Sequence, residues 1–223
     1  MEIETRIQAS SVEKDRGSHL RLFLASQSPR RLEILRQIGF QPEVIVSGIQ
    51  EHTEETAPER VVMDLSRQKA ENVASRLALD ASLKGEGLPS DVEKPAVVVL
   101  GADTVVCAGG RILGKPHTHE EAEKMIRLLS GRVHQVLSGV TLIELSSGRR
   151  LTFAEKTDVE VAPMTSKEIH SYAFSSEPMD KAGGYGIQGL FGRYITGISG
   201  DYTNVVGLPA SAVYRNLKTL LES

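Results

Sequence analysis

The hydrophobic residues of the chain follow two patterns that take turns along the sequence. Short apolar runs are typical of strands, and apolar residues that recur every three to four positions are typical of helices. The run Ala96–Leu100 is continuous and rich in valine, which is typical of a strand buried on both faces. From Pro58 to Leu77 the apolar side chains recur on one side of a long helix. These patterns predict strands at 21–25, 44–46, 96–100, 132–145, 149–162 and near 191–197, with a turn and a short strand within 110–116. They predict helices from 29, 58, 118 and 165 and at 209–222.

Capping residues mark several helix starts. Ser28 precedes Pro29, a pair that favours the first turn of a helix. Two further starts have the spacing of a capping box, Thr118 with Glu121 and Thr165 with Glu168. Strands and helices therefore mix within one unit. We predict an α/β fold with a mixed sheet, in two lobes that flank a cleft.

Two segments interrupt this pattern. Residues 1–20 are polar and mixed in charge, and we expect a disordered tail there. Residues 80–95 are rich in glycine, proline, serine and charge, which indicates a flexible insertion rather than a domain boundary. The remainder, 21–223, is predicted to form a single domain, which a chain of 223 residues allows.

Composition narrows the class of protein. Hydrophobic residues make up 40% and charged residues 25%, which suits a globular protein. Aromatic residues make up only 4%, so the core must consist mostly of aliphatic side chains. The net charge of −3 argues against a nucleic-acid binder, and no apolar run reaches the roughly 20 residues of a membrane helix. We therefore expect a soluble protein with no nucleic-acid or membrane partner.

The single cysteine, Cys107, excludes an intrachain disulfide and fits a reducing compartment, so we predict a cytoplasmic protein. No histidine lies near Cys107 in the sequence, which favours a small core residue at a strand end over a nucleophile. The six histidines are scattered without the spacing of a zinc site. His134 is interpreted as a polar strand residue near the cleft.

Two carboxylates are candidates for metal-assisted chemistry. Asp103 follows the buried strand 96–100, and the carboxyl ends of strands form ligand crevices in α/β sheets. It would hold Mg²⁺ or orient a water molecule, and the alternative is a cap of the next element. Glu51, in the polar loop 47–57, would be a second oxygen ligand, and the alternative is a solvated charge.

Basic side chains lie where an anion would explain them. Arg30 and Arg31 are at a helix start, where the macrodipole disfavours cations, so a shared anion accounts for them better than solvation alone. Lys69 lies on the long helix, where a surface lysine is the alternative. Lys115 precedes Pro116, and the extended backbone expected there would aim its ammonium at a fixed point.

The segment 180–189, which reads DKAGGYGIQG, is the strongest single signal. Its four glycines within seven residues permit positive φ and a close approach of the backbone to a ligand. Gln188 offers both a donor and an acceptor, which suits the edge of a base. A tight connection without a ligand is the alternative, although Asp, Lys, Tyr and Gln are interleaved with the glycines.

Together these segments resemble the Maf family of nucleoside triphosphate pyrophosphatases. The resemblance runs from about residue 22 to 221 and leaves out 1–20 and 80–95. The matching motifs are LASQSPRR at 24–31, QKA at 68–70, GADTVV at 101–106, GKP at 114–116, LSG at 129–131, EPMDKAG at 177–183, GIQG at 186–189 and VGLP at 206–209. The resemblance implies a fold similar to that of inosine triphosphate pyrophosphatases, a homodimer and a divalent cation, Mg²⁺ or Mn²⁺.

The resemblance also implies roles for individual residues. Asp103 matches the family's catalytic carboxylate and, with Glu51, its metal site. The positions that line the family's phosphate site are Ser26, Arg31, Lys69 and Lys181. The subgroup that cleaves dTTP and UTP, rather than 7-methyl-GTP, is matched at Arg30, Thr104, Lys115 and Gln188. The chain departs from the family at Gln50-Glu51, where an acidic pair is common.

The resulting hypothesis is hydrolysis of dTTP and UTP, and of modified pyrimidine nucleotides, to the monophosphate and pyrophosphate. Asp103 would orient or deprotonate the water, and the basic residues would neutralise charge on the leaving pyrophosphate. The alternative is a nucleotide-binding regulator of cell division without catalysis. An enzyme with an aspartyl-phosphate intermediate is disfavoured, because position 105 is valine where such enzymes usually carry a second aspartate.

Overall fold

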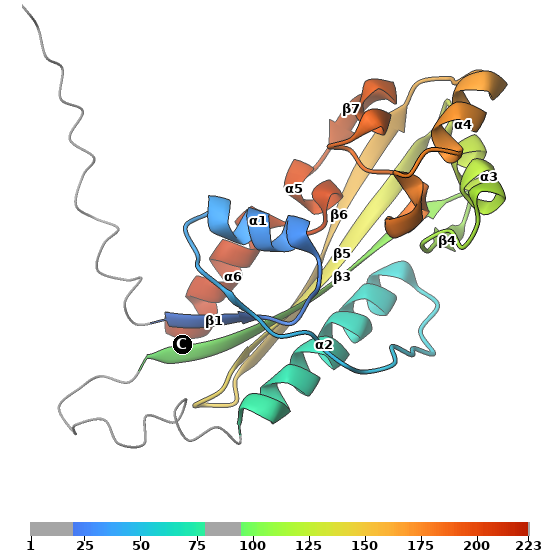
Figure 1. Cartoon of the computed structure of the whole chain (residues 1–223). Helices are drawn as coiled ribbons and strands as arrows, with labels where there is room; N and C mark the ends of the chain where they lie inside the picture. Colours follow the sequence, from blue (N-terminus) through green and yellow to red (C-terminus); the bar gives the residue numbers. More distant parts are fainter. Residues whose placement is uncertain (1–19, 79–94, 223) are drawn as a thin grey trace, which may run out of the picture.

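The computed structural model describes residues 20–78 and 95–222. The tail predicted for 1–20 and the insertion predicted for 80–95 lie outside these ranges, apart from Leu20 and Pro95. The α/β class and the mixed sheet are confirmed (Figure 1). In the described ranges, no helix is long and apolar enough to cross a membrane.

In the part of the chain that the structure describes, seven strands form one mixed sheet. Its order is β2-β1-β3-β5-β6-β7, with β4 paired to β3. β1 runs parallel to β2 and β3, and the other neighbours are antiparallel. The strands are β1 Leu20–Leu24, β2 Glu43–Val44, β3 Ala96–Ala108, β4 Arg111–Leu113, β5 Val133–Glu144, β6 Arg150–Val161 and β7 Ile195–Ser199.

Helices cover both faces of this sheet (Figure 1). α2 lies along one face, α1, α5 and α6 lie on the other, and α3 and α4 pack together near the far end of β3. The helices are α1 Pro29–Gln37, α2 Pro58–Leu77, α3 His119–Leu129, α4 Ser166–Ala173, α5 Tyr202–Val206 and α6 Ala210–Glu222. Three short 3₁₀ helices are η2 Pro178–Asp180, η3 Ala182–Gly184 and η4 Leu190–Tyr194.

The apolar run at the start of β3 is buried on both faces, as its pattern predicts. Val97 and Val99 belong to the core cluster that includes the apolar side of α2. Val98 and Leu100 belong to the cluster with α1 and α6. Alternate residues of one strand therefore fill two cores, which explains why no polar residue interrupts the run.

The prediction that the strand ends at Leu100, with Asp103 beyond it, is wrong. β3 continues to Ala108, and Asp103 pairs with Gly139 of β5 within the ladder. The strand continues because β5 remains its partner up to Cys107, whereas β1 ends beside Leu100. The opening beside Asp103 therefore lies at the carboxyl end of β1.

The segment predicted as a strand near 191–197 also differs. Residues 190–194 form η4, and the strand β7 begins only at Ile195. The Glu177 carboxylate accepts hydrogen bonds from the Leu190 and Phe191 amides, at 2.7 and 3.4 Å, and these bonds hold the 3₁₀ turn. The short helix α5, which was not predicted, begins after Asp201, whose side chain accepts from the Thr203 amide.

All three predicted caps are confirmed, and one of the two predicted capping boxes is complete. The Ser28 side chain accepts from the Arg31 amide, and both halves of the capping box at Thr165 are present. At the third, Thr118 accepts from the Glu121 amide at 3.2 Å. The Glu121 carboxylate accepts from the amide of the residue before the cap, His117, instead of completing the box.

α2 touches the backbone of the sheet at two glycines. A Cβ on Gly101 would lie under 3.0 Å from Ser66 O, and one on Gly139 would lie under 3.0 Å from Val62 O. Such closeness is possible only because these strand residues have no side chain. It brings Lys69 of α2 within reach of Asp103.

Candidate active site

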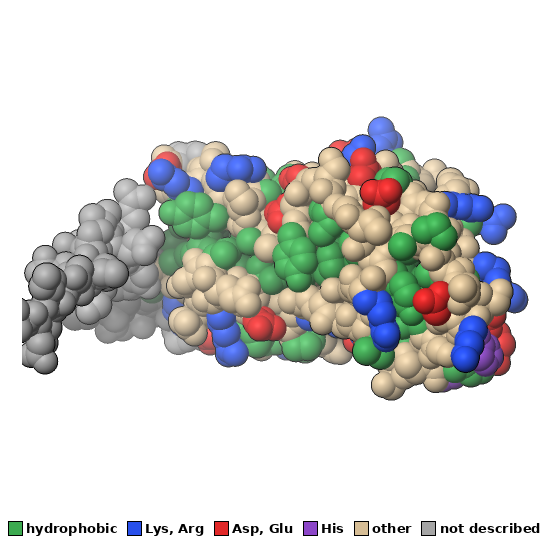
Figure 2. Space-filling view, turned by 90° about the horizontal axis from the view of Figure 1, so that it is seen from above, with side chains coloured by type: hydrophobic (Ala, Val, Ile, Leu, Met, Phe, Trp, Pro, Cys, Tyr) green, Lys and Arg blue, Asp and Glu red, His purple; other side chains and the backbone are tan. Residues whose placement is uncertain are grey.

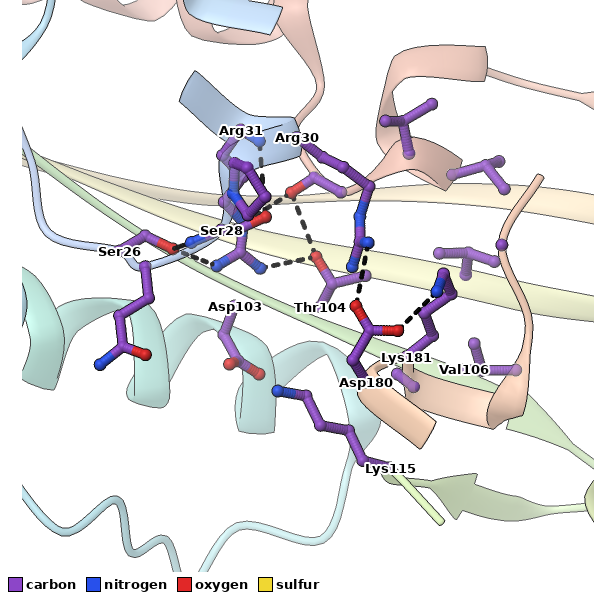
Figure 3. A pocket seen from close by; sticks show the side chains of 18 of the residues that line it. Ser26, Ser28, Arg30, Arg31, Asp103, Thr104, Val106, Lys115, Asp180 and Lys181 are labelled. Carbon is purple, nitrogen blue, oxygen red and sulfur yellow. Dashed lines mark hydrogen bonds and ion pairs between the residues drawn. The ribbon is translucent and has the colours of Figure 1, made fainter. Parts of the chain in front are cut away.

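All ten residues predicted for the site line one pocket of about 870 Å³. They come from the loop after β1, the start of α1, the loop before α2, α2 itself, the middle of β3, the turn after β4 and the segment 177–189 (Figure 3). They are Ser26, Arg30, Arg31, Glu51, Lys69, Asp103, Thr104, Lys115, Lys181 and Gln188. The chain thus brings together residues that are far apart in the sequence.

The centre of the pocket is a cluster of two carboxylates around one ammonium. Lys69 Nζ lies 2.6 Å from Asp103 Oδ1 and 3.0 Å from Glu51 Oε2. Lys69 is 9% exposed, so the alternative of a surface lysine is wrong. Gln68 Nε2 donates to the carbonyl of His52 at 2.6 Å, which attaches the loop that carries Glu51 to α2.

The Arg31 guanidinium donates most of its hydrogen bonds to other residues in the wall of the pocket. Its Nη1 donates to Ser26 Oγ and to Ala102 O, both at 2.9 Å, and its Nε donates to Gly207 O at 2.9 Å. Nη2 donates to Thr104 Oγ1 at 3.1 Å. Four of the five N–H groups of a guanidinium are thereby used. Burial lowers the pKa of Arg31, and the nearby Asp103 carboxylate opposes this shift.

A second charged cluster joins two sides of the pocket (Figure 3). Asp180 accepts from Arg30 Nη1 of α1 at 3.3 Å and also from Lys181 Nζ. Partial burial acts to raise the pKa of Asp180, but the bonds from Lys181 and Arg30 hold it below its usual value. Asp180 therefore forms ion pairs with Arg30 and Lys181, two cations that are predicted to contact the nucleotide.

Thr104, Lys115 and Gln188 differ in how they are held. Thr104 Oγ1 bonds Ser138 Oγ at 2.8 Å and Gly207 O at 3.2 Å, so its hydroxyl is fixed in the wall. Lys115 and Gln188 line the pocket without a side-chain hydrogen bond to any described residue. Figure 3 shows the Lys115 ammonium pointing into the pocket from the side opposite α1.

Sequence reasoning missed two features behind the pocket wall. Tyr185 lines the pocket, and its hydroxyl bonds His134 Nε2 at 2.6 Å. His134 is 2% exposed, and burial lowers its pKa from 6.5 to about 4, with the Asp158 charge opposing the shift. The second feature is the Glu177 carboxylate, which the motif EPMDKAG contained without a role. Neither contact is visible in local sequence, because the partners lie 51 and 13 residues away.

The charge of the pocket differs from that of the chain. Five basic and four acidic side chains line it, whereas the whole chain carries a net charge of −3. The described residues contain no group of three or more His, Cys, Asp or Glu that could hold a metal ion. Glu51 and Asp103 nevertheless face the same ammonium, and two carboxylates fit the ligand preference of Mg²⁺, which completes its shell with water and phosphate oxygens.

Comparison with known proteins identifies the family of the chain. The model of the Maf-like protein family matches residues 21–220. A dTTP/UTP pyrophosphatase of Agathobacter rectalis is 46% identical over 203 residues, 89% of this chain and 97% of that protein. That of Carboxydothermus hydrogenoformans is 44% identical over 199 residues, 89% and 98% of the two chains. That of Lachnoclostridium phytofermentans is 42% identical over 200 residues, 88% and 93%. The chain therefore belongs to the Maf-like protein family.

Proposed function

We propose that this enzyme hydrolyses dTTP and UTP, and modified pyrimidine nucleotides, to the nucleoside monophosphate and pyrophosphate. Relatives that share 42–46% of its residues carry the name dTTP/UTP pyrophosphatase. The observation that carries the proposal is the cluster of Asp103, Lys69 and Glu51 in a pocket lined by further cations. Such a site combines a base for water with positive charge for a triphosphate.

A divalent cation, Mg²⁺ or Mn²⁺, belongs to this proposal. Glu51 and Asp103 would hold it, because their carboxylates converge on one point, now the Lys69 ammonium, at 3.0 and 2.6 Å. When bound, the cation would neutralise charge on the triphosphate. Among the described residues, two carboxylates meet at this point, which leaves the rest of the shell to water and phosphate oxygens.

Asp103 is proposed as the general base. Its carboxylate is only 14% exposed, is fixed by the bond to Lys69, and carries oxygens that can accept a proton from water. Lys69 and Lys181 would neutralise charge that develops on the leaving pyrophosphate, and Ser26 would donate a hydrogen bond to a phosphate oxygen. Arg31 contributes positive charge to the same wall, although most of its donors are held by the protein.

Recognition of the pyrimidine is assigned to the opposite part of the pocket. The Gln188 amide would bond the polar edge of the base, since neither it nor the Lys115 ammonium bonds any described residue. Arg30 would complete the base-side contacts from α1. Thr104 would shape the wall, because its hydroxyl is fixed between Ser138 and Gly207.

A homodimer and a cytoplasmic location complete the proposal. Figure 2 shows hydrophobic side chains gathered in the middle of the face formed by α1, α5, α6 and β7. Exposed apolar residues of these elements are Ile198, Tyr202 and Tyr214. A contiguous apolar face supports association with a second copy. The single cysteine fits a reducing compartment.

The test is release of pyrophosphate with Mg²⁺ or Mn²⁺ over dTTP, UTP, CTP, GTP and 7-methyl-GTP. Metal-dependent release from dTTP and UTP supports both the chemistry and the substrate class. Release mainly from 7-methyl-GTP keeps the chemistry and overturns the roles of Arg30, Thr104 and Gln188. Binding of nucleotides without release of pyrophosphate would favour the non-catalytic regulator, and release of orthophosphate would favour a phosphatase.

A further inference from the structure

The carboxylate of Glu177 accepts three hydrogen bonds next to the glycine-rich segment 180–189. The donors are the Tyr172 hydroxyl at 3.0 Å, the Leu190 amide at 2.7 Å and the Phe191 amide at 3.4 Å. The carbonyl oxygen of Glu177 accepts a further bond from Lys181 Nζ at 2.7 Å. Glu177 therefore joins the start of the segment to the turn η4 that follows it.

Two residues between these anchor points, Lys181 and Gln188, are among those to which nucleotide contacts are assigned. Lys181, Tyr185 and Gln188 all line the pocket between Glu177 and Leu190. Gln188 is two residues before Leu190, whose amide the carboxylate holds at 2.7 Å. Joining a loop at both ends reduces the freedom of the residues between them. The Glu177 carboxylate thus restricts the backbone position from which the Gln188 side chain extends.

One of the four glycines in this segment lies against the Glu177 carboxylate, and a second lies against Lys181, which bonds the Glu177 carbonyl. A Cβ on Gly189 would lie under 3.0 Å from the Glu177 carboxylate, and one on Gly186 would lie under 3.0 Å from Lys181 Cε. The sequence pattern attributed such glycines to the approach of a ligand. Here they make room for Glu177 and Lys181, while Gly183 and Gly184 supply the positive φ, at 69° and 72°.

The anchor is itself attached to the core. Tyr172 belongs to α4 and is 4% exposed, and its ring lies 5.0 Å from the ring of Phe191. Burial and the neighbouring Glu177 charge raise the pKa of Tyr172 well above its usual value, so its hydroxyl stays a neutral donor. Two of the three donors to the carboxylate, Tyr172 and Phe191, therefore belong to buried residues of the core.

We propose that Glu177 is a positioning residue for base selection. By joining the two ends of the segment, it keeps Gln188 where the amide meets the pyrimidine, and it acts through Gln188 rather than on the reacting phosphates. This inference rests on the proposed function of the pocket. The chemical class that it selects is a nucleotide whose base offers the polar edge of a pyrimidine.

The test measures binding of the α,β-imido analogues of dTTP and GTP by calorimetry in the presence of Mg²⁺. Glu177→Gln keeps the size of the side chain but replaces one acceptor oxygen by an NH₂ group that cannot accept. Its preference for the dTTP analogue over the GTP analogue should fall about tenfold. Tyr172→Phe removes only one donor and should lower the preference by about threefold. The control Glu59→Gln, at an exposed carboxylate of α2, should leave it unchanged.

A double variant separates positioning from a general weakening of the protein. In a Gln188→Ala background, Glu177→Gln should change the preference less than about twofold, because the group that it positions is gone. Hydrogen exchange should accelerate at the Leu190 and Phe191 amides and stay unchanged in α2. If Glu177→Gln does not fold, Tyr172→Phe carries the same comparison.

Three results would overturn the inference. In the first, Glu177→Gln still lowers the preference for the dTTP analogue tenfold in the Gln188→Ala background. In the second, Glu177→Gln leaves the preference unchanged although the Leu190 and Phe191 amides exchange faster, and in the third the wild-type protein does not prefer the dTTP analogue. Because the readout is binding, it tests Glu177 whether or not pyrophosphate is released. Failure of the proposed hydrolysis and failure of this inference therefore give different results.

Discussion

Lys69 is the residue on which the proposed metal carboxylates converge. Two carboxylates that face each other repel, and a cation between them removes this repulsion. Lys69 meets Asp103 at 2.6 Å and Glu51 at 3.0 Å, so it holds the two carboxylates close together. The arrangement presents a triphosphate and its cation with oxygen ligands that are already in place, which reduces the reorganisation needed for binding.

Asp103→Asn should lower turnover of dTTP at least about a hundredfold, the usual contribution of a general base. The amide oxygen still accepts from Lys69, so the free energy of unfolding should change by less than about 1 kcal/mol. Pyrophosphate release at saturating dTTP and urea denaturation check the two parts. Glu59→Gln, at an exposed carboxylate of α2, is the control. Full activity in a folded Asp103→Asn protein would remove Asp103 from the mechanism.

Gln188→Glu should change selectivity more than stability. The substitution replaces the donor half of the amide by a second acceptor, so kcat/KM for dTTP should fall by about tenfold or more relative to that for GTP. Gln188 has no hydrogen bond to a described residue, and the urea midpoint should therefore stay within error. Equal relative rates for dTTP, UTP and GTP in the variant and the wild type would contradict the role of Gln188.

The residue types of the site are predictable from the sequence, but their partners are not. The sequence predicts Asp103, Lys69 and Glu51 as site residues from their charge and their positions relative to a strand, a helix and a loop, and all three line one pocket. Arg31 also lines it, yet two of the four hydrogen bonds of its guanidinium go to backbone carbonyls, Ala102 O and Gly207 O. Those carbonyls come from β3 and from the end of α5, and their approach depends on the packing of whole elements.

Among the elements, α2 has the closest contact with the sheet. Its backbone at Val62 and Ser66 faces Gly139 and Gly101, where any side chain would collide. The contact fixes the height of the helix above β3 and β5. Since Lys69 follows on the same helix, the distance from its ammonium to Asp103 depends on these two glycines.

Gly139→Ala should lower the free energy of unfolding by about 3 kcal/mol, because the new methyl group displaces α2 from β5. Activity should fall with it, since Lys69 moves away from Asp103. Gly48→Ala is a matched control, because a Cβ there meets nothing within 4 Å and Gly48 has no positive φ. Urea denaturation of both variants is the measurement. Equal midpoints for Gly139→Ala and Gly48→Ala would show that α2 tolerates the methyl group.

Local pattern predicts most elements of this fold and fails where tertiary contacts decide. Periodicity located α1, α2, α3, α4, α6 and the paired strands β5 and β6. The polar residues Asp103 and Thr104 suggested that β3 had ended, although they continue a ladder whose polar side chains face the pocket. The 3₁₀ turn η4 depends on the distant Glu177 carboxylate, which no local pattern can reveal.

The molecule as a whole should be sensitive to mild acid through His134. Its pKa in the folded state is about 4, against 6.5 for the free side chain, so the unfolded chain binds the proton more tightly. This contribution to stability is fully present above pH 6.5 and is lost as the pH falls towards 4. The difference corresponds to about 3 kcal/mol.

Urea denaturation of the wild type and of His134→Gln between pH 7 and about pH 4 measures this effect. The wild type should lose stability more steeply with falling pH than the variant, because glutamine does not titrate. His117→Gln, at an exposed histidine whose side chain bonds no described residue, is the control and should follow the wild type. Parallel pH profiles for the wild type and His134→Gln would exclude the buried imidazole as the cause.

The length of β3 has a consequence for the timing of events in the pocket. Asp103 is near the middle of a strand of 13 residues, whose pairing with β5 runs from Val98 to Cys107. Opening begins at loops and element ends, so the centre of such a ladder is among the last places to exchange its amides. Glu51 and Gln188 lie outside regular strands and helices, where motions are faster. The strand therefore keeps Asp103 in place over times longer than the loop motions that would let nucleotide enter and leave.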